Sequence, residues 1–357
     1  YYLLSRIIHP SIGFVAGIVS ATVGFSAPAV LAAIAFANYF APLFPSINIT
    51  VTALIIVLCV NILHSTKLST GKLFQEWTTI FKIVLILIFI VIGLFSRGHQ
   101  SISVIPTRYD FNLMISPEFA VNLVWVSYAY AGWNSSVYVV GEIVGPEKNI
   151  FRSIFFGTMI VTLLYIVLNY VFLYVTPMDQ LIGKVEVGYL SGVHLFGEKF
   201  ATVLSLCIGL MLISTVSSYV YIGPRIIQAI GKDYDRLSIL SKTDYQGIPL
   251  NAFFLQLFIS IVFVITSTFE EVLLYTGITL IITSTITVCS LFYLRYKEPE
   301  LVRPYIVWGY PWTSLIFVLL NSWVLYYTFR LQTFESLIGL GLMAISFGLF
   351  FIIKKDK

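Results

Sequence analysis

Ten long apolar segments restrict this chain to folds that can be built inside a membrane. A helix needs about 20 apolar residues to cross the hydrocarbon core of a bilayer. Charged residues make up only 11% of the 357 residues, against about 25% in soluble domains. We therefore expect an all-α, multi-pass membrane protein whose spans are residues 11–40, 49–64, 76–96, 117–141, 152–176, 197–223, 250–267, 271–294, 306–327 and 334–353.

The distribution of Lys and Arg predicts which side of the membrane each loop faces. If the N-terminus is cytoplasmic and all ten segments cross, fifteen of the 21 basic residues are cytoplasmic and five are external, with Lys82 inside a segment. Cytoplasmic loops carry an excess of Lys and Arg. We therefore expect the protein to lie in the plasma (inner) membrane, with both ends of this chain in the cytoplasm.

The segment at residues 117–141 contains small and polar residues at membrane depth. Its centre, Tyr128-Ala-Tyr-Ala-Gly-Trp-Asn134, is followed by Ser135 and Ser136. Lipid cannot pair backbone N–H and C=O groups, so a spanning helix breaks only where other groups satisfy them. Secondary transporters build their binding sites at such broken helices. We therefore predict an interruption near Gly132 that offers backbone dipoles to a small polar ligand.

Two other spans carry polar groups with more than one interpretation. Lys82 lies inside the span at residues 76–96, where a lysine at a helix centre costs about 2.5–3.5 kcal/mol. It either extends its amine to the headgroups or acts as a buried cation in place of a coupling ion. The hydroxyl run at residues 214–219 either ligates a cation or forms ordinary interhelical hydrogen bonds. Pro224, just beyond it, predicts a kink or the end of that helix.

The sequence contains no pattern typical of an enzyme, a metal site or a cofactor site. It has no phosphate-binding loop, and its three cysteines are far apart. No His or carboxylate stands at ligand spacing from any of the four histidines, which are His9, His64, His99 and His194. We therefore expect no enzymatic activity, no metal, no cofactor and no nucleic-acid partner.

Four motifs resemble those of amino acid permeases of the amino acid–polyamine–organocation (APC) superfamily, closest to the L-type amino acid transporters. The first runs from Tyr128 through Val140-Gly-Glu-Ile-Val-Gly-Pro-Glu-Lys-Asn149 to Arg152. The others are Phe74-Gln-Glu-Trp-Thr-Thr-Ile-Phe-Lys82, the run from Ser217 to Arg225, and the stretch from Tyr293 to Pro311. The first and last are specific in combination, and together the motifs cover residues 74–312.

This resemblance implies a LeuT-like fold, in which a 5+5 inverted repeat is followed by two additional helices. Residues 1–357 would form one transporter domain. Within it, residues 1–96 would be the remainder of the first repeat, residues 117–294 the second repeat and residues 306–353 the additional helices. On this alignment the chain begins near the end of the second family helix. We therefore expect an N-terminally truncated chain without the first family helix.

The resemblance also assigns roles to particular residues. Tyr128 would be an aromatic gate over the substrate, and Glu142 and Arg152 would belong to the gate at the cytoplasmic mouth. Lys82 would occupy a sodium-like position, with Ser214 and Ser217 nearby. The substrate-binding residues would be Tyr128, Ala129, Tyr130, Ala131, Gly132, Trp133 and Asn134.

The expected function is secondary active transport of amino acids by alternating access. Neutral L-amino acids are the expected substrates, carried by exchange or by proton-linked uptake. Animal family members pair with a glycoprotein through a loop cysteine, which the loop at residues 41–48 lacks, so we expect no disulfide-linked subunit. The alternative is a membrane receptor or scaffold that senses amino acids without moving them, and the short loops favour transport.

Overall fold

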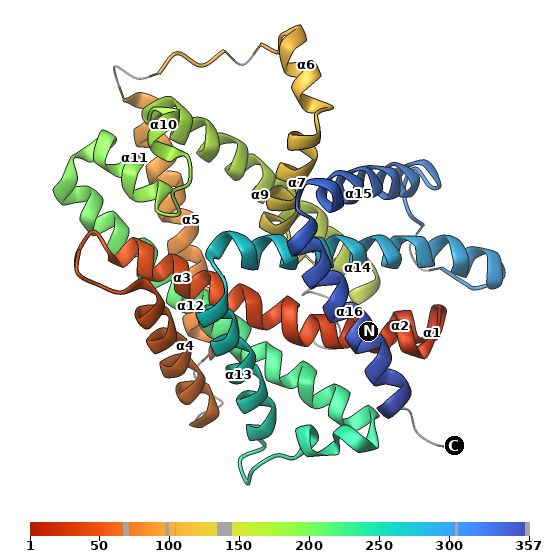
Figure 1. Cartoon of the computed structure of the whole chain (residues 1–357). Helices are drawn as coiled ribbons and strands as arrows, with labels where there is room; N and C mark the ends of the chain where they lie inside the picture. Colours follow the sequence, from red (N-terminus) through yellow and green to blue (C-terminus); the bar gives the residue numbers. More distant parts are fainter. Residues whose placement is uncertain (67–70, 97–99, 104, 134–144, 304–305, 354–357) are drawn as a thin grey trace. The chain divides into compact units, whose positions relative to one another are not determined.

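The computed structural model describes most of the chain, and every regular element in the described part is a helix (Figure 1). The shorter elements are α1 (Tyr2–Ile7), α6 (Arg108–Met114), α10 (Met178–Leu181), α11 (Val187–Phe196) and η3 (Asp235–Ser241). The described residues are 1–66, 71–96, 100–103, 105–133, 145–303 and 306–353.

Eight helical stretches in the described residues are long and apolar enough to cross a bilayer. They match eight of the ten predicted segments. Their bounds are Pro10–Phe40, Ile49–Thr66 (α4), Trp77–Phe95 in α5 (Gly71–Phe95), Asn149–Val175 in α9 (Pro146–Val175), Glu198–Asp233 (α12), Phe269–Lys297 (α14), Trp312–Leu331 (α15) and Thr333–Ile353 (α16). Of the other two segments, residues 250–267 contain the shorter apolar helix α13 (Leu250–Thr266), and residues 117–141 begin with α7 (Pro117–Ala129). The all-helical membrane fold is thus confirmed, and the count of ten crossings stays a prediction.

The first predicted span is one continuous helical stretch with a change of winding. It consists of α2 (Pro10–Val19), the π-helical segment η1 (Ser20–Ser26) and α3 (Ala27–Phe40). Pro28 has no N–H to give to the carbonyl four residues earlier, at Gly24, so the α-helical ladder cannot be complete here. Widened π-turns of this kind are frequent at functional sites.

The helix α12 extends well past its predicted end. The prediction stopped the span at residue 223 and allowed Pro224 to end the helix, whereas α12 continues to Asp233. Hydropathy detects only the apolar part of a helix, and this one continues through a polar stretch that includes Lys232. Of the two alternatives for Pro224, the end of the helix is therefore wrong, and a kink stays a prediction.

The helices pack into two compact units. The first comprises Tyr1–Gly24, Pro106–Val161 and Leu273–Lys357, and the second comprises Phe25–Ile105 and Thr162–Val272. Both units combine stretches that are distant in sequence. The predicted inverted repeat stays a prediction.

In the first unit, α7 packs against α15, and α16 packs against α2. The buried side chains between α7, α14 and α15 include Val124, Ile278 and Val324. Gly277 lets α14 approach closely, because a methyl group added there would lie 2.5 Å from a Val124 methyl carbon. Small residues at helix contacts are typical of membrane bundles, where packing replaces the hydrophobic effect as the source of association.

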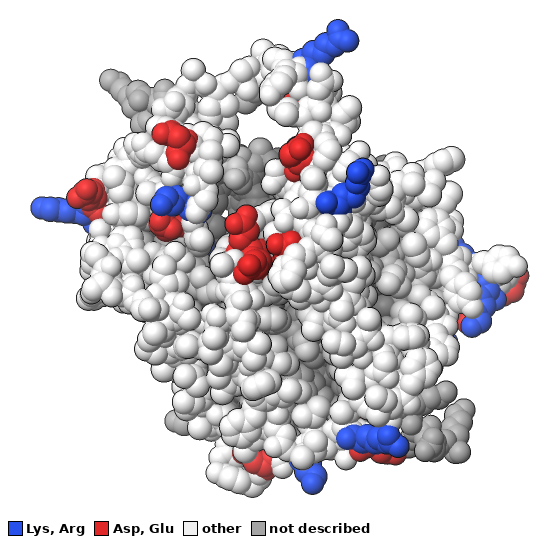
Figure 2. Space-filling view, in the orientation of Figure 1, with Lys and Arg blue, Asp and Glu red and all other residues white. Residues whose placement is uncertain are grey.

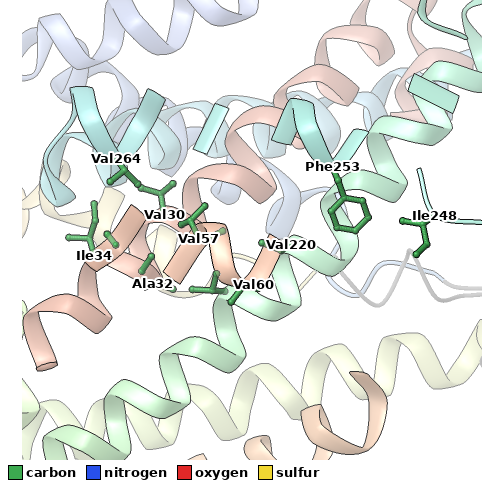
Figure 3. Packing of buried hydrophobic residues seen from close by; sticks show 13 residues of the cluster. Val30, Ala32, Ile34, Val57, Val60, Val220, Ile248, Phe253 and Val264 are labelled. Atoms are coloured by element: carbon green, nitrogen blue, oxygen red, sulfur yellow. The ribbon is translucent and has the colours of Figure 1, made fainter. Parts of the chain in front are cut away.

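In the second unit, α3 packs along α12, and α4 and α13 pack against both. The alanine-rich α3 allows this close approach, since Ala29 and Ala33 are fully buried. Figure 3 shows the apolar cluster at this centre, including Val30, Ala32, Ile34, Val57, Val60, Val220, Ile248, Phe253 and Val264.

The outer faces of the long helices are apolar. The most apolar part of α9, for example, is almost entirely exposed. Figure 2 shows broad uncharged areas, with Lys, Arg, Asp and Glu confined to a few separate groups. Exposed apolar area on this scale is expected where lipid is the solvent.

Candidate functional site

The helix α7 ends inside the segment that was predicted to span the membrane. It begins at Pro117, where the Ser116 side chain accepts a hydrogen bond of 3.2 Å from the Phe119 backbone N–H. It ends at Ala129, and a turn at residues 130–133 follows. The helix thus ends before Gly132, as predicted, whereas residues 134–144, where a second half-helix would begin, lie outside the described residues.

The turn after α7 depends on glycine. The Tyr130 N–H donates to the Val126 carbonyl (3.2 Å) and the Ala131 N–H donates to the Tyr128 carbonyl (2.9 Å), which closes the last helical turn. Gly132 follows with φ of +99°, a conformation that strains any residue with a Cβ atom. The small residues of the motif thus let the helix stop where hydropathy alone predicts that it continues.

The predicted substrate residues lie around this helix end. Tyr128 and Tyr130 are half-buried, and Trp133 is 52% exposed. The remaining small residues of the motif are exposed. Asn134 and Glu142 lie outside the described residues, so their predicted roles stay predictions.

The end of α7 has the electrostatic character that a substrate ammonium group requires. The last turn of an α-helix carries a partial negative charge, because its peptide dipoles are aligned. An ammonium group carries donors and a positive charge, so it complements this end. Broken helices in transporters bind charged groups by this means.

Lys82 lies in the second unit and contacts the hydroxyl run of α12. Its Nζ donates a hydrogen bond of 3.1 Å to the Thr215 hydroxyl, which itself donates to the Met211 carbonyl (3.3 Å). No Asp or Glu in the described part of the chain forms an ion pair with this lysine. The Lys82 amine thus contacts α12, and its role in place of a coupling ion stays a prediction.

The two serines predicted near Lys82 bond to other side chains. The Ser214 and Thr78 hydroxyl oxygens are 2.8 Å apart, in a fully buried contact between α12 and α5. The Ser217 hydroxyl oxygen lies 2.7 Å from Nε2 of His64, at the end of α4. Residues 214–217 of α12 are thus linked to α4 and α5 by three polar contacts.

Thr215 is the functional candidate that the sequence interpretation missed. It belongs to the predicted hydroxyl run, but the resemblance favoured its neighbours Ser214 and Ser217. Adjacent positions on a helix point about 100° apart, so the sequence could not say which hydroxyl faces Lys82. The position of a partner helix decides this, and hydropathy carries no information about it.

The remaining gating residue, Arg152, is exposed near the start of α9. Its predicted counterpart, Glu142, lies outside the described residues. The described part of the chain has no group of three or more His, Cys, Asp or Glu placed to hold a metal ion.

Comparison with known proteins assigns the chain to a class. The model of the family described as "Amino acid permease" matches residues 1–347. The chain therefore belongs to the amino acid permease family, a family of membrane transporters.

Three relatives show which members of the family this chain resembles. The "Large neutral amino acids transporter small subunit 2" of Mus musculus is 24% identical over 322 residues, which are 87% of this chain and 59% of the relative. "Solute carrier family 7 member 12" of Mus musculus is 25% identical over 317 residues, 86% of this chain and 67% of the relative. The "b(0,+)-type amino acid transporter 1" of Oryctolagus cuniculus is 20% identical over 266 residues, 73% of this chain and 53% of the relative.

These relatives confirm the resemblance to L-type amino acid transporters. The chain spans 59% of the length of the large neutral amino acids transporter subunit that it matches.

Proposed function

We propose that this protein carries amino acids across the membrane by alternating access, and that the broken end of α7 forms part of the substrate site. The observation that carries this proposal is the stop of α7 at Ala129, followed by Gly132 with positive φ. Family membership and the names of the relatives support amino acids as the cargo.

The binding chemistry follows from the zwitterionic form of an amino acid. Carbonyl groups at the end of α7 accept hydrogen bonds from the substrate ammonium group. Free N–H groups at the start of a second half-helix hold its carboxylate, so two opposed helix ends match the two charges. Tyr128, in the last turn of α7, closes over the bound substrate as an aromatic gate.

Neutral side chains are the preferred cargo. In the eight candidate spans, Asp and Glu occur only within three residues of a helix end, at Glu198, Asp233, Glu270, Glu271 and Glu335. A cationic side chain would bring a second positive charge with no carboxylate in the interior of these eight spans to compensate it, which is costly. The relative from Mus musculus that is named for large neutral amino acids agrees with this proposal.

The Lys82 amine takes the place of a coupling cation. Its hydrogen bond to Thr215 puts the amine against α12, where a sodium ion would otherwise need oxygen ligands. Transport is then independent of sodium and proceeds by exchange or by proton-linked uptake. The protein acts in the plasma membrane with both ends of this chain cytoplasmic, and without a disulfide-linked subunit.

Flux measurements test the proposal and separate it from the receptor alternative. The purified protein is reconstituted in liposomes, and uptake of a radiolabelled neutral amino acid is followed with and without unlabelled amino acid inside, sodium outside and a proton gradient. We expect uptake that sodium does not change and that internal amino acid or a proton gradient stimulates. Saturable binding without any flux would contradict transport and favour a sensor.

A further inference from the structure

A small cavity in the second unit has a polar lining that the proposed function does not use. It lies where the end of α4, the second half of α12 and the loop before α13 meet. Its volume is about 40 Å³, and the residues that matter for its chemistry are His64, Tyr221, Arg225, Gln228, Pro249 and Phe253. Phe253 and the neighbouring Ile248, both labelled in Figure 3, belong to its apolar wall.

The guanidinium group of Arg225 gives this cavity a positive charge. Its central carbon lies 3.5 Å from the centre of the Tyr221 ring, and Nη1 donates to the Tyr221 carbonyl. Within the described residues no carboxylate pairs with it. The carboxylate of the adjoining loop, Asp244, instead accepts from the backbone N–H groups of Gln246 (2.9 Å) and Ile248 (2.8 Å).

The Arg225 side chain is therefore held in place, and it carries further N–H donors besides the one that bonds to the Tyr221 carbonyl. A guanidinium group carries five N–H donors in a planar fork, and stacking on Tyr221 fixes its plane. Gln228 adds an amide to the lining, and His64 adds an imidazole whose Nε2 lies 2.7 Å from the Ser217 hydroxyl oxygen. Guanidinium groups set out in this way favour planar or tetrahedral oxyanions, above all phosphate.

The size of the cavity separates an oxyanion from the proposed cargo. A cavity that holds one water has room for one water-sized sphere, about 10–15 Å³, and a cavity of about 40 Å³ has room for a small group such as a phosphate. A whole amino acid with a large side chain does not fit.

The surroundings of the cavity favour a lipid as the source of the phosphate. Both α4 and α13, which meet at the cavity, carry exposed stripes of large apolar side chains at helical spacing. On α4 these are Ile55, Leu58 and Ile62, and on α13 they are Phe254, Phe258 and Ile265. Residues 232–244 carry three cations (Lys232, Arg236 and Lys242) and three carboxylates (Asp233, Asp235 and Asp244), so Arg225 is the charge that would hold a headgroup at the cavity.

We propose that this cavity binds the phosphate of an anionic phospholipid, with Arg225 as its main ligand and the acyl chains lying along α4 and α13. The site is separate from the residues assigned to the amino acid, so lipid binding can be measured without reference to transport.

Affinity measurements with a soluble short-chain phosphatidylglycerol test the proposal on the purified protein in neutral detergent. We expect R225Q to weaken binding about tenfold or more, because it removes a charge-assisted contact. The matched control is K232Q, which removes the same charge from an exposed position two turns further along α12, and which we expect to weaken binding less than about twofold. Equal losses in the two variants would show diffuse attraction and overturn the site.

Two further arms make the result decisive. R225K keeps the charge but not the planar fork, so it should bind the lipid about threefold more weakly while melting at the wild-type temperature. This variant decides the question if R225Q does not fold, and unchanged affinity in it would overturn the role of the guanidinium group. Inorganic phosphate should fail to displace the lipid at equal concentration, and full displacement would contradict a lipid site.

Discussion

The contact between Lys82 and Thr215 allows a quantitative prediction. T215V keeps the side-chain volume and removes the hydroxyl that accepts from Nζ over 3.1 Å. Polar contacts between membrane helices average about 0.6 kcal/mol in double-mutant cycles and reach about 1.7 kcal/mol. A charged donor increases the free energy that such a contact contributes, and the partial exposure of Lys82 decreases it. We therefore expect a coupling free energy of about 1 kcal/mol between K82M and T215V.

The assay is a double-mutant cycle in mixed micelles, with reversible unfolding followed by circular dichroism. The wild type, the two single variants and the double variant give the coupling directly. T202V is the matched control, because Thr202 lies on the same helix and its hydroxyl only donates to the Glu198 carbonyl (2.8 Å) within that helix. Additivity of K82M and T215V within about 0.3 kcal/mol would refute the argument that the lysine is held by this hydroxyl.

Three further predictions follow from the geometry. K82A should reduce uptake of a labelled neutral amino acid or make it dependent on sodium, and unchanged uptake with unchanged ion dependence would remove Lys82 from the mechanism. G277A should destabilise the protein by about 1–3 kcal/mol in thermal unfolding, because the new methyl would lie 2.5 Å from a side-chain carbon of α7, whereas G341A, with no atom within 4 Å, should not. T107A should raise the pKa of Asp110, which hydrogen bonds from the Thr107 backbone and side chain now hold below its ordinary value. The hydrogen bonds from Thr107 to the ionised Asp110 carboxylate therefore stabilise the start of α6 at pH values above the ordinary carboxyl pKa. This stabilisation is lost as the pH falls through the lowered pKa of Asp110. NMR titration of Asp110 in the wild type and in T107A checks this.

The sequence predicted the positions of the spans because the thickness of the bilayer sets their length. Eight predicted segments correspond to long apolar helices in the structure. Their ends were less predictable, as α12 shows by continuing through Pro224 to Asp233. Hydropathy reports where a helix leaves the apolar phase, whereas backbone hydrogen bonding decides where it ends.

The end of α7 was also predictable, because its cause is local. Gly132 takes a positive φ that a residue with a Cβ atom adopts only with strain, and α7 ends within this motif. The π-helical segment at Ser20–Ser26 and the short helix α11 were not predicted. They depend on how neighbouring helices pack, which apolar periodicity does not report.

The polar contacts of α12 could be predicted only in part. The hydroxyl run indicated a polar face, but the pairing of Thr215 with Lys82, and of Ser214 with Thr78, depends on the rotation of one helix against another. A sequence shows which hydroxyls are available, and packing selects among them.

The most direct test of the proposed substrate site is the affinity of the purified protein for a labelled neutral amino acid after a change at Gly132. An alanine at φ of +99° costs about 1–2 kcal/mol in backbone strain, so G132A should move the turn or weaken binding about tenfold. The control G157A adds the same methyl to α9 where no atom lies within 4 Å, and it should bind like the wild type. Wild-type affinity in G132A, with G157A also unaffected, would contradict a binding site built on the broken end of α7.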